Sequence, residues 1–318
     1  MTADGDGDWS WAPPHARPLL SAVVAAACAD PRIVGVTIGG SAADGSMDAF
    51  SDLDFVVVCR DEDQPALLAE AAGFAAGLGP LLCCFTGEHV GEPRLLICLY
   101  GPLEWRSSSR SQRDDLAAVD GARGSALPQQ PGAADGGDVP GVLHVDLKFV
   151  ADRDLDQRVE DGLVLWQRDG ALDRAFARAA PVWPRTDPQW IEDRFWVWVH
   201  YGATKLGRGE LFECLDMLAA LRGIVFGPLI AQARGRHASG VRRLEQFAPE
   251  LVPALAATVG DHTPRGCAAA LRAAVALYRE LRGDGSHLVR RAAAEAASLD
   301  YLAGIEARLG LTADGGRS

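Results

Sequence analysis

The sequence predicts an α+β protein, with a mixed sheet and flanking helices in the first half and a bundle of α-helices in the second. Apolar, β-branched runs alternate with Ala-rich segments up to about residue 150. From residue 187 onward strand signals disappear and apolar residues recur at helical spacing. Three prolines, at 181, 184 and 188, mark the change. The 318 residues are enough for two domains, each with its own core.

The elements of the first half follow from these runs and their stop signals. Pro18 to Ala29 is expected to form a helix that Asp30-Pro31 ends. Ile33 to Ile38 predicts a strand that leads into the turn Gly39-Gly40-Ser41. The other elements expected here are strands at 53–59, 81–85, 94–100 and 142–150 and a helix at 65–78.

Residues 104–141 interrupt this pattern. They are dense in Ser, Arg, Asp, Gly, Pro and Gln and contain little to bury, so we expect a disordered insert between two adjacent antiparallel strands. The second half is expected to form four or five helices, with periodic segments at 190–206, 210–234, 265–281 and 289–309. The predicted organisation is a frayed start (1–17), a first domain (18–183), a helical domain (184–311) and a tail (312–318).

Composition and charge exclude several classes of function. Hydrophobic residues make up 48% and charged residues 23%, which is typical of a globular protein and not of a disordered or fibrous chain. The formal net charge of −12 disfavours general nucleic-acid binding and suits a cationic small molecule. No apolar run approaching ~20 residues and no basic leader is apparent, so we expect a cytoplasmic protein without a membrane partner. The seven cysteines lack a CxxC pair, which disfavours a zinc site.

Two acidic residues stand at the start of the second predicted strand. Alternation along a strand points Asp52 and Asp54 to one face, about 7 Å apart. Crowded carboxylates need a positive charge between them, and Mg²⁺ prefers such oxygen ligands together with phosphate oxygens. The alternative interpretation is a solvated strand end whose acids cap neighbouring backbone.

A third carboxylate, Asp146, lies in the middle of the apolar strand at 142–150, where an unpaired charge is costly. If this strand lies beside the one with Asp52 and Asp54, the three acids could bind two divalent ions. Such a pair can align an attacking hydroxyl with an α-phosphate. The Gly39-Gly40-Ser41 turn could offer N–H groups and a hydroxyl to a triphosphate.

The chain resembles the nucleotidyltransferase superfamily related to DNA polymerase beta in the order of its motifs. These are an apolar strand, a Gly-Ser pair, ten further residues, Asp-x-Asp and a later lone Asp on a strand. The motifs span Ile33 to Val58 and Val142 to Val150. The two-domain plan resembles antibiotic nucleotidyltransferases that adenylylate aminoglycosides or lincosamides, although the 104–141 insert departs from that family's pattern.

This resemblance implies a role for each matching residue. Gly40 and Ser41 would hold the triphosphate of ATP or another nucleotide, and Asp52 and Asp54 would bind two Mg²⁺ ions. Asp146 would complete the metal site and is a candidate general base. The full set of predicted nucleotide-binding residues in the first domain is Gly39, Gly40, Ser41 and Ser51.

Other charged residues allow two interpretations each. Tyr201 and Lys205 lie at helical spacing and resemble the family helix that supplies a phosphate-contacting lysine, so both are predicted to bind nucleotide. The alternative is a basic last turn that complements the helix dipole. Lys148 could neutralise the acidic cluster or contact substrate. Glu210 and Glu213 could be a general base, anchors for substrate ammonium groups or ordinary exposed acids.

The sequence therefore predicts a Mg²⁺-dependent transferase that moves a nucleoside monophosphate, expected to be AMP from ATP, onto a hydroxyl of a small molecule and releases pyrophosphate. An aminoglycoside-like antibiotic is the expected acceptor, which would make the protein a resistance enzyme. The alternatives are a regulatory or antitoxin-like transferase that acts on or binds a partner protein, and a degenerate nucleotide-binding module. The sequence predicts no nucleic-acid partner and does not predict the oligomeric state.

Overall fold

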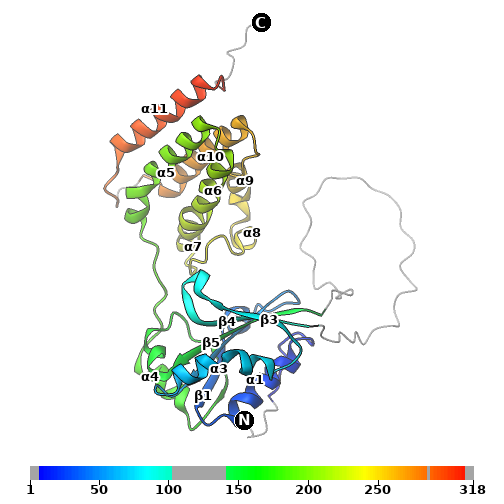
Figure 1. Cartoon of the computed structure of the whole chain (residues 1–318). Helices are drawn as coiled ribbons and strands as arrows, with labels where there is room; N and C mark the ends of the chain where they lie inside the picture. The colour runs from blue at the N-terminus through cyan, green and yellow to red at the C-terminus, as the bar shows by residue number, and fades with distance from the viewer. Residues whose placement is uncertain (1–6, 102–140, 285–286, 312–318) are drawn as a thin grey trace, which may run out of the picture. The chain divides into compact units, whose positions relative to one another are not determined.

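The computed structural model describes residues 7–101, 141–284 and 287–311 (Figure 1). Apart from residue 141, the predicted insert lies outside the described residues, as does the predicted tail. The chain divides into two compact units, Met1–Trp183 and Pro184–Ser318, here named the N-terminal unit and the helical unit. Of the stretch 1–17 that was expected to fray, residues 1–6 lie outside the described residues. In the described part the expectation is wrong at Trp9, which is buried in the core and whose indole N–H donates to Ser21 Oγ at 2.8 Å.

A six-stranded mixed sheet forms the centre of the N-terminal unit, in the order β3-β4-β5-β2-β1-β6. The strands are β1 (Ile33–Ile38), β2 (Leu53–Cys59), β3 (Leu81–Gly87), β4 (Glu92–Tyr100), β5 (Leu143–Ala151) and β6 (Leu163–Gln167). β2 and β5 are parallel, and the other neighbours are antiparallel. β4 and β5, on either side of the insert, pair as predicted. Together with the helices of the second half, this sheet confirms the α+β class.

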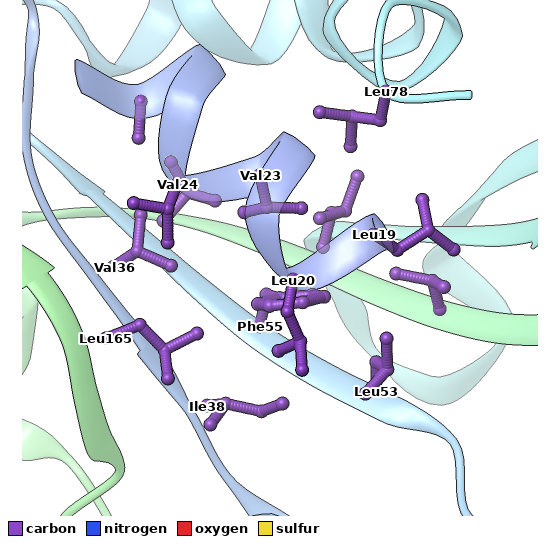
Figure 2. Packing of buried hydrophobic residues seen from close by; sticks show 14 of the residues in the cluster. Leu19, Leu20, Val23, Val24, Val36, Ile38, Leu53, Phe55, Leu78 and Leu165 are labelled. Carbon is purple, nitrogen blue, oxygen red and sulfur yellow. The ribbon is translucent and has the colours of Figure 1, made fainter. Parts of the chain in front are cut away.

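The helices of the N-terminal unit are α1 (Arg17–Ala29), α2 (Gly40–Ala43), α3 (Gln64–Ala76) and α4 (Ala171–Arg178). On one side of the sheet, the main core contains residues of α1 and α3 together with every second residue of β2, as Figure 2 shows for Leu20 against Leu53 and Phe55. The opposite face carries a smaller cluster in which Leu172 of α4 groups with Val58 and Val150. This cluster does not include the other ends of β2 and β5, where the predicted site lies.

The helical unit contains α5 (Pro188–Arg208), α6 (Leu211–Leu221), α7 (Gly227–Ala233), α8 (Leu244–Phe247), α9 (Val252–Ala257), α10 (Pro264–Arg282) and α11 (Ala292–Arg308). The helix predicted at 210–234 is interrupted by a π-helical turn at Arg222–Phe226. The backbone of Gly240 approaches Gly227 so closely that a Cβ at Gly227 would lie 1.8 Å from the Gly240 carbonyl oxygen. The described residues of this unit form the seven helices α5 to α11, so the predicted count of four or five was too low.

One segment of the described chain, Leu211–Ala233, is long and apolar enough to pass a length-and-composition test for a membrane span. Its residues Cys214, Leu218, Phe226 and Ile230 belong to the buried core of the helical unit. Packing within the protein therefore explains why this segment is so apolar.

Candidate active site

The parallel pairing of β2 and β5 brings the predicted acidic residues together. Asp54 and Asp146 are register partners on these neighbouring strands, which lie about 4.8 Å apart in a sheet. Asp52 directly precedes Leu53, the partner of Val145, and its charge acts on Asp146. Three carboxylates from distant parts of the sequence thus share one region of the sheet.

The carboxylate of Asp146 lies in an environment that disfavours its charge. Burial is the main cause that raises the pKa of Asp146, and the negative charge of Asp52 raises it further, while His144 acts in the opposite direction. His144 Nε2 lies 3.0 Å from Asp146 Oδ1. Oδ1 is buried and has no further hydrogen-bond partner among the described residues. A buried carboxylate with a raised pKa is suited to a cation.

The glycine turn after β1 lies directly against Asp54. The Gly39 N–H donates to the Asp54 carbonyl oxygen at 2.8 Å. Gly40 has a φ of +57°, and a Cβ there would lie 2.4 Å from Asp54 Oδ2, so this position requires glycine. Ser41 follows in the short helix α2. The turn predicted to hold phosphates and a carboxylate predicted to hold metal are therefore in contact.

Ser51 stands at the other end of the loop between α2 and β2. Its Oγ accepts from the Asp48 N–H at 2.9 Å and lies 3.0 Å from Asp48 Oδ1. The hydroxyl therefore closes the turn immediately before Asp52, and its predicted contact with nucleotide remains a prediction.

The donor set suits Mg²⁺ in its chemistry. Carboxylate oxygens are the protein ligands that Mg²⁺ prefers, and a cation at Asp146 Oδ1 would compete there with His144 Nε2. Within the part of the chain that the structure describes, however, no group of three His, Cys, Asp or Glu side chains stands ready to hold a metal ion. The three acids are neighbours, and a shared cation would require their side chains to close around it.

Of the two roles considered for Lys148, the structure does not support neutralisation of the three acids, and contact with substrate stays a prediction. Lys148 lies two residues after Asp146, but its ammonium pairs with Glu92 Oε2 at 2.8 Å instead of neutralising the three acids. Arg94 also pairs with Glu92, at 2.8 Å. The hydrogen bond from Arg94, followed by that from Lys148, lowers the pKa of Glu92 to about 2.

An apolar surface continues from Asp146 across the sheet. Ile97 on β4 is the register partner of Asp146, and Phe85 on β3 is the partner of Ile97. Phe85 is 53% exposed and Ile97 is partly exposed. We name these two residues the apolar strip. Sequence analysis missed it, because alternation along β4 shows two faces but does not show which one carries Asp146.

The helical unit contains the other predicted residues. Lys205 Nζ lies 4.9 Å from the centre of the Tyr201 ring, so the two residues share a face of α5 as predicted. The same ammonium lies 2.8 Å from Glu210 Oε2 and 3.5 Å from Glu213 Oε1. The Tyr201 hydroxyl donates to Glu213. Lys205 would therefore have to exchange carboxylate partners for a phosphate.

Comparisons with known proteins give little further information. No protein-family model and no curated protein matches the sequence. Among solved structures, the chain is similar to an aminoglycoside 6-adenyltransferase from Bacillus subtilis, with 15% identity over 92% of this chain and 97% of that one. The TM-score is 0.30, and a likeness this distant carries no argument about function.

Proposed function

We propose that the protein is a Mg²⁺-dependent nucleotidyltransferase that moves a nucleoside monophosphate, AMP in the first instance, from a triphosphate onto a hydroxyl of a small molecule in the cytoplasm. The observation that carries this proposal is the pairing of Asp54 with Asp146 beside the Gly39-Gly40 turn. The buried carboxylate of Asp146 supports it, since burial and the charge of Asp52 raise its pKa despite the opposite effect of His144, and a bound cation would relieve that cost.

Each group of residues in the proposed site has its own role. The Gly39-Gly40-Ser41 turn, with Ser51, positions the triphosphate. The contact of Lys205 and Tyr201 with nucleotide stays a prediction from the sequence. Asp52, Asp54 and Asp146 hold Mg²⁺, which when bound neutralises charge on the phosphates. Asp146 accepts the proton of the acceptor hydroxyl. That oxygen bonds to the α-phosphorus as the α–β phosphoanhydride bond breaks and pyrophosphate leaves.

The order of the strands indicates which side the acceptor takes. The glycine turn follows β1, on one side of Asp54, whereas Asp146, Ile97 and Phe85 follow one another on the other side. If the turn holds the nucleotide, the β5-β4-β3 side remains open to the acceptor. The net charge of −12 favours a polycationic, aminoglycoside-like acceptor, while the apolar strip suits an acceptor with an apolar face.

The test is release of pyrophosphate from ATP and Mg²⁺ with a panel of hydroxyl acceptors. The panel contains aminoglycosides as polycations, lincosamides as compounds with an apolar face, and nucleotides. We expect turnover with one class and its loss in Asp54→Asn, while Asp216→Asn, an exposed carboxylate of α6, retains it. No turnover with any class would refute the proposal of a small-molecule acceptor. Transfer of the nucleotide from ATP onto a protein would instead identify a protein as the acceptor.

A further inference from the structure

A fourth carboxylate, Glu160, lies at the glycine turn, although no sequence motif includes it. Its Oε1 is 3.5 Å from the Gly40 backbone nitrogen, a long hydrogen bond. The same oxygen lies 3.1 Å from the position that a Cβ on Gly39 would occupy. Glu160 and Asp54 therefore lie against the two consecutive glycines of the turn.

The loop that carries Glu160 is fixed on both sides. Arg158, two residues before, donates to the carbonyl oxygens of Leu155 at 3.0 Å and Phe176 at 3.3 Å. Gly162, two residues after, packs so closely on β1 that a Cβ there would lie 2.7 Å from Thr37 Oγ1. The position of Glu160 at the turn is therefore built into the loop.

The described residues offer the charge of Glu160 no ion-pair partner. Among the residues that the structure describes, no Lys, Arg or His forms an ion pair with it, and its carboxylate is exposed. The neighbouring Asp161 differs, because it pairs with Arg158. A negative charge thus stands at the turn where the proposed function places triphosphate oxygens, and like charges repel.

We propose that Glu160 is a specificity-determining residue that makes the site select the Mg²⁺ complex of a nucleotide over the free nucleotide. This inference rests on the proposed function. A free triphosphate must displace the carboxylate from the Gly40 N–H and suffers its repulsion, whereas a triphosphate that carries Mg²⁺ brings compensating charge. The long contact with Gly40 is weak enough to be exchanged when a nucleotide binds.

The test is equilibrium binding of a non-hydrolysable ATP analogue to the full chain, measured by calorimetry in EDTA and in saturating Mg²⁺. For Glu160→Gln we expect affinity for the metal-free analogue to rise at least about fivefold, the effect of one like charge about 4 Å away in water. Affinity for the Mg²⁺ complex should stay within about twofold of wild type, since its compensating charge already screens the carboxylate. Glu62→Gln, an exposed carboxylate of the same unit, is the matched control and should leave both affinities unchanged.

Each result has one interpretation. If the wild type binds nucleotide and Glu160→Gln changes neither affinity, Glu160 does not select and the inference is refuted while the proposed function stands. If the variant weakens binding of the Mg²⁺ complex, Glu160 is a metal ligand and the inference is again refuted. If no protein binds the analogue under either condition, the proposed function fails and the inference fails with it.

Discussion

Asp146→Asn should make the metal-free protein more stable and less responsive to Mg²⁺. Burial and the like charge of Asp52 raise the pKa of Asp146, and together they outweigh the opposite effect of His144, which lies 3.0 Å from Oδ1. Burying a polar group without full compensation costs about 1–3 kcal/mol, more for a charged group, and the amide removes the charge. We therefore expect a gain of about 1 kcal/mol in the free energy of unfolding, which is about 2–4 °C for a domain of this size.

Mg²⁺ should reverse the order of the two proteins. At ten times its dissociation constant, an ion that binds only the folded state adds about 1.4 kcal/mol. The wild type should gain this amount, and Asp146→Asn should gain little, because one of the three ligands has lost its charge.

Urea-induced unfolding in EDTA and in Mg²⁺, at constant ionic strength, measures both effects. Asp216→Asn is the control, since its carboxylate is exposed on α6 in the helical unit. A variant that is less stable than wild type in EDTA, or one that keeps the full response to Mg²⁺, would refute the interpretation of Asp146 as a strained metal ligand.

Three further predictions follow from the same geometry. The pKa of Glu92 is lowered to about 2, so its ion pairs stabilise the fold fully at pH values above its ordinary pKa of 4.5, and this stabilisation is lost as the pH falls toward 2. The free energy of unfolding should therefore fall less steeply with pH in this range in Glu92→Gln than in the wild type. Lys205→Met should weaken binding of the Mg²⁺–nucleotide complex about tenfold by calorimetry, and unchanged binding would remove Lys205 from the site. Phe85→Ser should raise KM about tenfold for an acceptor with an apolar face, with kcat unchanged.

The strands that carry the site were predictable because their signals are local. β1 and β2 are apolar, β-branched runs bounded by proline, glycine or acidic residues, and their predicted bounds agree with the structure. β6 and α4 were not predicted. β6 spans five residues at the sheet edge and α4 spans eight, so each is too short for its apolar pattern to define a helix or a strand.

The site itself was predictable only where one motif contained its residues. The spacing of Asp52 and Asp54 identifies them as candidates, and Asp146 is identified by its place within an apolar strand. The partner of Lys148 was not predictable, because Glu92 becomes its neighbour only through the β4–β5 pairing. Glu160 was missed for the same reason: the pairing of β6 with β1 brings its loop to the glycine turn.

The positions of β2 and β5 in the sheet determine which parts of the site are expected to unfold locally first. They are the third and fourth of six strands, so their amides should exchange with solvent at the slowest rate in this unit. The residues between α2 and β2 are mostly exposed and form turns, so their amides should exchange early. Asp54 and Asp146 thus rest on the most persistent part of the sheet, and the segment ahead of β2, which ends at Asp52, can rearrange while these two acids stay in place.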